Sequence, residues 1–150
     1  MGYYSQVAYR IRFDDSATLG QFINYVFGSG NEHMIEALKE CEVDFKDYYI
    51  NFHKFERKWY EGYEYVQGHI SLYELCNKED TPFFDKCGYT FHRVGEEQAD
   101  IDSFEGGQEP PYDDFYTSTT IEVPFDTNYT PYGDILSKLT EQQPTEGEKA

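Results

Sequence analysis

The chain has 150 residues, with 29 Asp and Glu against 12 Lys and Arg and a formal net charge of -17. Its 15 Tyr, 12 Phe and single Trp supply more aromatic surface than disordered chains carry, so the composition excludes an unfolded polyelectrolyte. The excess of acid also argues against nucleic acid as a direct partner, because binding to phosphates depends on Lys and Arg.

The N-terminal third predicts one strand and two helices. Large apolar residues alternate with Gln, Ala and Arg over residues 6–13, the period that turns one face of a strand toward a core. Asp15 and Ser16 can cap a helix, and Asn31 can cap a second helix that ends near Cys41. The first helix has apolar residues at amphipathic spacing: Leu19, Phe22, Ile23, Val26 and Phe27.

The middle of the chain predicts a long strand, a helix and a short strand. Residues 45–60 are rich in aromatic side chains, which favour a pleated, half-buried surface, and Gly62 follows them. The residues that share one face of the next helix are Val66, His69, Ile70, Tyr73 and Cys76. Residues 89–94, after Gly88, are typical of a short strand.

The C-terminal third predicts a loop, a last strand and a short helix. Residues 95–115 read GEEQADIDSFEGGQEPPYDDF, and Gly and Pro at this density indicate a long acidic loop. Residues 117–125 alternate as a strand does, and residues 134–139 fit a helix. We therefore expect one α+β domain over residues 1–139, with a mixed or antiparallel four-stranded sheet, two or three helices packed on one face, a long acidic loop between the last two strands, and a disordered tail over residues 140–150.

Cysteine usage and hydropathy predict the compartment. Three cysteines form no C-x-x-C pair, so reduced thiols are the simple interpretation. The N-terminus lacks the basic and apolar regions of a signal peptide, and no run of ~18 apolar residues occurs. We expect a cytoplasmic protein without a membrane partner.

Three segments resemble a known group of proteins. MGYYSQVA at residues 1–8, KWYEGYEYVQ at residues 58–67 and RVGEEQAD at residues 93–100 resemble, in the same order, segments of small uncharacterised proteins encoded by tailed bacteriophages. The likeness covers about half of the chain and departs from the pattern in residues 106–116. It implies no catalytic residue; it implies a phage product that acts in the host bacterial cytoplasm, against a host factor.

Catalytic and metal sites have weak support in the sequence. There is no G-x-S-x-G, P-loop or G-x-G-x-x-G motif, so we assign no catalytic residue and no cofactor. Asp100, Asp102 and Gly106 suggest a calcium loop, but Phe104 and Glu105 stand at the fifth and sixth positions, where that loop requires a ligand and a glycine. We therefore assign no metal ligands, and we keep an enzyme with a divalent cation in the acidic loop as the third hypothesis.

The distribution of acid predicts a class of partner. Residues 94–137 contain eleven Asp and Glu and no Lys or Arg. Carboxylates spaced like phosphates can occupy the basic groove of a DNA- or RNA-binding host protein, such as a defence factor, and inhibit it. Alternate strand residues lie ~6.8 Å apart, close to the spacing of phosphates. The candidate partner-binding residues are Glu96, Glu97, Asp100, Asp102, Glu105, Glu109, Asp113, Asp114, Tyr112 and Tyr116.

A second hypothesis concerns assembly. The aromatic strand within residues 48–59 could pair with its own copy in a homodimer or a larger homo-oligomer, the acid then serving solubility. The order of preference is an acidic, DNA-mimic-like inhibitor, then this assembly protein, then the cation-dependent enzyme.

Overall fold

A five-stranded antiparallel sheet forms the centre of the fold, which the computed structural model describes over residues 2–142. Neighbouring strands follow the order β2-β3-β1-β4-β5, and every neighbouring pair is antiparallel. The strands are β1 (Ser5–Phe13), β2 (Glu42–Asp44), β3 (Tyr49–Arg57), β4 (Cys87–Val94) and β5 (Ile101–Gly107). The α-helices of this part of the chain are α1 (Ser16–Gly28), α2 (Glu32–Glu40), α3 (Glu64–Glu74) and α4 (Tyr132–Gln142). The predicted α+β class is confirmed.

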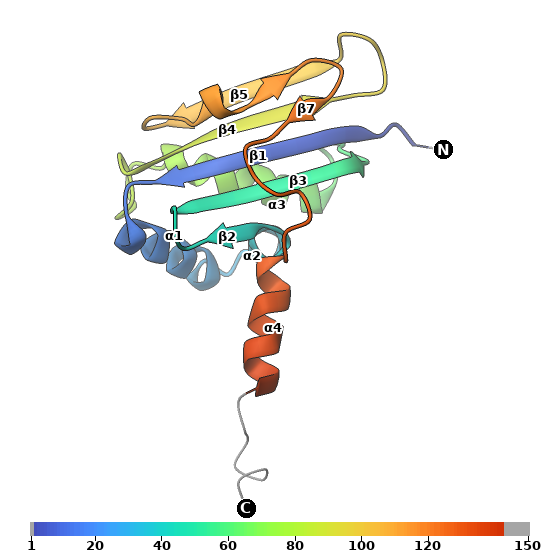
Figure 1. Cartoon of the computed structure of the whole chain (residues 1–150). Coiled ribbons are helices and arrows are strands. Elements are labelled where there is room, and N and C mark those ends of the chain that lie inside the picture. Colours follow the sequence, from blue (N-terminus) through green and yellow to red (C-terminus); the bar gives the residue numbers. More distant parts are fainter. Residues whose placement is uncertain (1, 143–150) are drawn as a thin grey trace, which may run out of the picture.

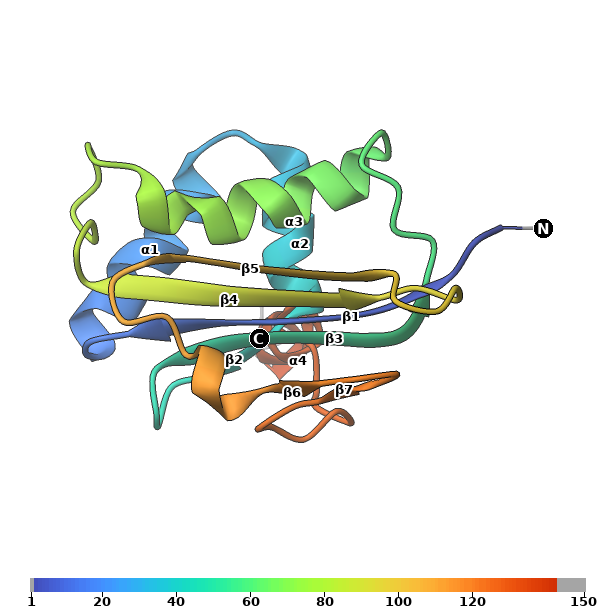
Figure 2. The same cartoon turned by 90° about the horizontal axis from the view of Figure 1, so that it is seen from above.

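Both faces of the sheet are covered. The helices α1, α2 and α3 lie on one face, which we call the helix face (Figure 1, Figure 2). The chain between β5 and α4 crosses the opposite face, which we call the hairpin face, and includes a small antiparallel pair of strands (Figure 2). Its short elements are η2 (Tyr112–Asp114), a single 3-10 turn, β6 (Tyr116–Thr117) and β7 (Ile121–Glu122).

The alternation of β1 explains its central place. Val7, Tyr9 and Ile11 are fully buried on the helix face, where they join the main hydrophobic core. Ala8 is also fully buried, but it packs with Ile121 of β7 on the hairpin face. A strand with both faces buried is stable only inside a covered sheet, and β1 pairs with β3 on one side and β4 on the other.

The predicted caps of α1 and α2 are confirmed. The Asp15 side chain accepts a hydrogen bond from the Thr18 N–H, and the Asn31 side chain accepts one from the Met34 N–H. Each cap satisfies an amide that would otherwise lack a partner at the first turn of the helix.

The prediction of a continuous acidic loop is wrong, because β5 lies within it. Residues 101–105 stay partly or fully exposed at the edge of the sheet, so the burial contrast that marks a strand is weak. Gly106 and Gly107 suggest a loop, but a side chain at Gly106 would meet the Tyr89 ring, and Gly107, with φ +75°, lies against the backbone of Cys87. Close packing therefore accounts for these glycines.

The predicted strands at residues 45–60 and 117–125 are also corrected, so the four-stranded count is wrong. Residues 45–48 form a turn between β2 and β3, in which the Asp44 carboxylate accepts the N–H groups of Lys46 and Asp47. The aromatic residues of this segment favour a strand, so the turn was not predicted. Asp44 indicates the turn, because Asp side chains commonly accept backbone N–H groups two or three residues on. Residues 118–120 form a second turn, between β6 and β7.

The C-terminal helix begins beside the sheet and points away from it. The N–H of Tyr132 donates to the carbonyl of Cys41, at the junction of α2 and β2. From there α4 extends away from the sheet (Figure 1) and ends at Gln142, later than predicted. Residues 143–150, most of the predicted tail, lie outside the described residues. No helix of residues 2–142 is long and apolar enough to cross a membrane.

Candidate functional site

Aromatic side chains form an open floor between β5 and α3. On β4, Phe91 points to the helix face, and its partner across the ladder on β5 is Phe104. The two rings are stacked, with centroids 5.8 Å apart. The ring centroid of Tyr73 in α3 lies 5.3 Å from that of Phe91, and the ring centroid of Trp59 lies 5.9 Å from it. Because Phe104 is 53% exposed, this aromatic layer reaches the surface.

Two adjoining hollows lie over this floor. One measures about 280 Å³ and the other about 610 Å³, a size within the range of ligand sites. Both are lined by Glu61, Ile70, Tyr73 and Phe104. We call the combined feature the α3–β5 groove. Its full lining is Tyr3, Ser5, Trp59, Tyr60, Glu61, Gln67, Ile70, Tyr73, Glu74, Tyr89, Phe91, Arg93, Asp100, Asp102, Ser103, Phe104 and Glu105.

The lining of the groove is acidic. It includes five carboxyl residues, and Arg93 is the one Lys or Arg among its described lining residues. The Arg93 guanidinium is itself bound by two of these carboxylates, at 2.6 Å to Asp100 and 2.8 Å to Asp102. It also donates to the Ser5 hydroxyl. The carboxylates bordering the groove therefore exceed its positive charge.

The Tyr73 hydroxyl reports this negative field. Burial is the main cause that raises the pKa of Tyr73 well above its usual value. The negative charges of Glu74, Glu61 and Asp102 raise the Tyr73 pKa further. Carboxylates from α3, from the loop before it and from β5 thus all raise the pKa of the same hydroxyl, although they are far apart in sequence.

The turn between β4 and β5 is fixed by the N-terminal residues. The Tyr3 hydroxyl donates to Asp100 at 2.6 Å and accepts the Glu97 N–H at 2.8 Å. The Tyr4 N–H donates to the Glu96 carboxylate at 2.7 Å. Hydrogen bonds from Arg93 and Tyr3 hold the pKa of Asp100 below its usual value.

The structure separates the predicted partner-binding residues into two groups. The group near the groove and the adjoining turn is Glu96, Glu97, Asp100, Asp102 and Glu105. The other group belongs to the segment after β5, which crosses the hairpin face (Figure 2): Glu109, Tyr112, Asp113, Asp114 and Tyr116. Asp114 lies 3.6 Å from Arg10, and the Glu109 carbonyl accepts from Arg12. The predicted residues therefore do not form one face.

Sequence reasoning missed the floor of the groove. Trp59, Tyr73 and Phe91 belong to three separate segments that meet only in the fold. Phe104 carried a signal, because a large aromatic residue stands between acids in a stretch that was assigned to a loop. Glu61 and Glu74 lie outside residues 94–137, the acidic stretch that supplies the predicted partner-binding residues.

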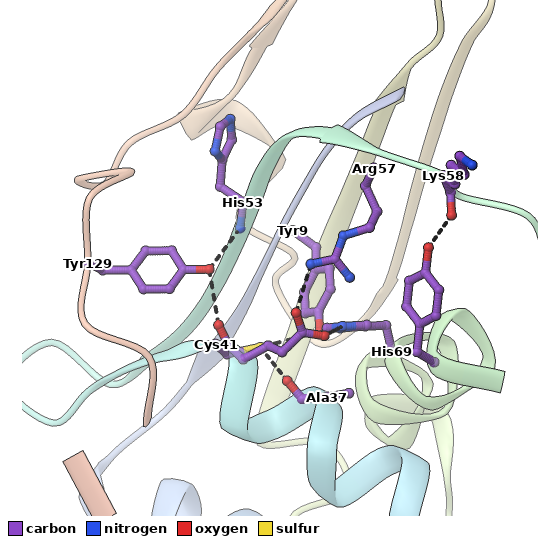
Figure 3. Close-up of polar contacts among 10 residues, drawn as sticks. Tyr9, Ala37, Cys41, His53, Arg57, Lys58, His69 and Tyr129 are labelled. Atoms are coloured by element: carbon purple, nitrogen blue, oxygen red, sulfur yellow. Dashed lines mark hydrogen bonds and ion pairs between the residues drawn. The ribbon is translucent and has the colours of Figure 1, made fainter. Parts of the chain in front are cut away.

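A second polar cluster lies inside the protein (Figure 3). The Tyr9 hydroxyl is 2.6 Å from His69 Nδ1, and His69 Nε2 is 2.9 Å from Glu40 Oε1. The other Glu40 oxygen accepts from Arg57 at 2.8 Å. Burial opposes ionisation of Glu40, but the hydrogen bonds from His69 and Arg57 outweigh it and lower the Glu40 pKa to about 2.

These contacts determine which atoms of the cluster carry a proton. Ionised Glu40 accepts from His69 Nε2–H, so the neutral ring accepts from the Tyr9 hydroxyl at Nδ1. Burial is also the main cause that lowers the pKa of His69, in keeping with a neutral ring. Tyr9 and His69 have no exposed surface, so their polar atoms form hydrogen bonds within the protein and cannot contact a substrate. The cluster connects β1, α2, β3 and α3.

The sequence hypothesis of a divalent cation requires carboxylates grouped as ligands. Within the described residues, no three or more His, Cys, Asp and Glu side chains are grouped so that they could hold a metal ion. The acidic residues of the predicted loop over residues 95–115 are distributed between the groove with its adjoining turn and the segment that crosses the hairpin face.

Comparisons of the chain with models of protein families, with curated proteins and with solved structures found no match. Fold and site together define an α+β domain with an acidic, aromatic groove beside an edge strand. Its function has to be argued from the residues of that groove.

Proposed function

We propose that this protein is an interaction protein that binds a basic segment of another protein in the α3–β5 groove. The observation that carries the proposal is the combination of an exposed aromatic floor with surrounding carboxylates whose one basic neighbour, Arg93, is already paired. Such a surface suits a ligand that brings both cationic and apolar side chains.

Lys and Arg side chains can use both parts of this surface. Their aliphatic stems pack on rings, and their charged ends reach carboxylates at the rim. A cation over an aromatic face adds about 0.5–1 kcal/mol at exposed sites. The net charge of -17 would attract such a ligand over a longer range and speed association at low salt.

A nucleic-acid-binding host protein is the partner that this proposal favours. Proteins of that class carry Lys- and Arg-rich segments for phosphate binding, and occupying such a segment would inhibit them. The phage context implied by the sequence resemblance agrees with an inhibitor of a host defence factor. Direct mimicry of neighbouring phosphates by Asp100 and Asp102 has less support, because Arg93 pairs with both carboxylates and offsets one of their two charges.

The alternative of assembly through residues 48–59 stays a prediction. Within this segment, β3 pairs with β1 along one edge and with β2 over residues 49–51 on the other. The His53 N–H on β3 donates to the Tyr129 hydroxyl. These contacts occupy one edge of β3 and residues 49–51 and 53 on the other. We prefer the groove because it combines an aromatic floor with carboxylates.

A binding experiment on two matched double variants tests the proposal. The probe is a short peptide of alternating Arg and Leu, and the readout is the fluorescence of Trp59, the single Trp of the chain and a lining residue of the groove. Glu61→Gln with Glu74→Gln removes two charges at the groove and should weaken binding about three- to tenfold, because exposed ion pairs contribute about 0.2–1 kcal/mol each.

The control removes the same charge elsewhere. Glu79→Gln with Glu122→Gln alters two exposed carboxylates that do not line the groove. It should change affinity less than twofold at ~50 mM salt, and binding by the unaltered protein should weaken toward ~300 mM. Equal weakening by both double variants would show that net charge alone attracts the peptide, and absence of binding would reject the proposed function.

A further inference from the structure

The outer edge of β5 is oriented toward the groove. In an antiparallel ladder, successive residues direct their N–H and C=O groups alternately to opposite sides. The bonds Gly95 N–H to Asp100 O and Gln108 N–H to Cys87 O, both 2.8 Å, show that even-numbered residues of this segment face β4. Odd-numbered residues of β5 therefore direct their backbone polar groups outward.

Two of these outward-facing residues have backbone N–H and C=O groups without hydrogen-bond partners among the described residues. The Gly107 N–H donates to the Asn77 side chain, and the Ile101 N–H donates to the Ala99 carbonyl. For Ser103 and Glu105, no partner of the outward N–H and C=O groups lies among residues 2–142. They form a row of two donors and two acceptors in the middle of a seven-residue edge strand.

The hollow beside this row can take side chains of an added strand. The larger hollow is lined by Ser103, Phe104 and Glu105 of β5 and, across from them, by Ile70 and Tyr73 of α3. Figure 2 shows α3 on the helix face of the sheet, and its Ile70 and Tyr73 line this hollow together with Phe104 of β5. A strand added to this edge would lie about 4.8 Å from β5 in the plane of the sheet, next to the groove on the helix face. Its alternate side chains would then reach the aromatic floor.

We infer that the basic segment binds as a sixth strand, paired with β5 at Ser103 and Glu105, with alternate side chains in the α3–β5 groove. This inference rests on the proposed function and adds the conformation of the ligand. Main-chain bonds to an edge strand supply affinity that does not depend on side chains, and the neighbouring groove supplies selection for alternate residues.

Charge favours a basic partner over a second copy of this chain. The strand β5 contains Asp102 and Glu105 and no Lys or Arg. Pairing β5 with itself would bring these carboxylates together between two chains that each carry -17, and like charges across a ladder are destabilising. A strand that carries Arg or Lys would instead be attracted to the carboxylates of β5.

The first test removes a main-chain hydrogen-bond donor from β5. Ser103→Pro removes an outward N–H, and proline is tolerated on an edge strand where its nitrogen faces outward. The control Ser103→Ala keeps that N–H but loses the Ser103 hydroxyl contact with His92. We expect the alternating Arg-Leu peptide to bind Ser103→Pro about tenfold more weakly than Ser103→Ala.

The peptide provides a second measurement that leaves the protein unchanged. Two probes carry N-methyl groups on alternate residues, one in each register. Because only one set of N–H groups faces β5, one N-methylated probe should lose about tenfold in affinity, and the other should bind nearly as tightly as the parent. Circular dichroism of each protein variant confirms that it remains folded.

The outcomes separate this inference from the proposed function. If both N-methylated probes and Ser103→Pro show unaltered affinity while Glu61→Gln with Glu74→Gln still weakens binding, strand addition is wrong and the groove proposal stands. If the parent peptide does not bind at all, the proposed function fails first. If the unaltered chain is a dimer that Ser103→Pro dissociates, the edge is occupied by a second copy and the inference is overturned.

Discussion

At the scale of single residues, Arg93 determines how much of the predicted acidic segment remains available. Its side chain is 14% exposed and contacts Asp100 and Asp102 together. Charge-assisted bonds of this kind hold both carboxylates in place. Two residues predicted to bind a partner are therefore engaged within the fold, and Glu61 and Glu74 carry more of the unpaired charge at the groove.

Glu40 supports a prediction about pH. Its pKa in the folded protein is about 2, below its ordinary value of 4.5, so ionised Glu40 stabilises the fold above pH 4.5 and loses that contribution as the pH falls toward 2. Glu40→Gln should lower the free energy of unfolding at pH 7 by about 2 kcal/mol, with allowance for solvent screening of a side chain that is 32% exposed.

Urea unfolding followed by circular dichroism at several pH values measures this effect. The difference in unfolding free energy between the unaltered protein and Glu40→Gln should stay constant from pH 7 to about 5 and shrink below 4.5. A difference that is the same at pH 3.5 as at pH 7 would show that Glu40 acts through packing and not through its charge.

At the scale of elements, a glycine sets the approach of α2 and α3. A side chain at Gly68 of α3 would overlap the backbone carbonyl of His33 in α2. Gly68→Ala should therefore destabilise the protein by about 1–3 kcal/mol, although alanine is the better helix former.

The matched control for this packing effect is Gly20→Ala in α1, where nothing lies within 4 Å of the new side chain. This variant should be neutral or up to about 1 kcal/mol more stable. Thermal unfolding of both variants compares them directly. A Gly68→Ala protein as stable as Gly20→Ala would mean that the two helices do not depend on this close approach.

The elements also show what the sequence could predict. The helix α1 was predictable because Asp15, Leu19 and Phe22 combine a cap with an amphipathic stripe, both local signals. The strand β5 was not predictable in the same way, because residues 101–105 stay mostly exposed and Gly106 and Gly107 serve close packing. A strand at a sheet edge is defined by its pairing, which a single sequence does not display.

The site was less predictable than the fold. The acidic character of the region after Val94 was visible, and Asp100, Asp102 and Glu105 do line the groove. The aromatic floor was not visible, since Trp59 and Phe91 are 32 positions apart and meet through the packing of β4 against the loop after β3. Composition predicted a kind of partner, and the tertiary contacts form an acidic, aromatic groove.

At the scale of the whole molecule, the net charge of -17 is distributed over both faces of a covered sheet. The charge alone would attract many basic proteins at low salt, with little selection among them. Selection has to come from shape, and the α3–β5 groove combines an aromatic floor, a row of open backbone groups and unpaired carboxylates. The central claim is that binding takes place there.

A titration of the nitrogen-15-labelled full chain with the alternating Arg-Leu peptide, followed by amide chemical shifts, tests this claim most directly. We expect the largest changes at Ile70, Tyr73, Ser103 and Glu105, with little change at Asp114 on the hairpin face. Changes spread evenly over the acidic residues of both faces, or concentrated around Asp114, would contradict it.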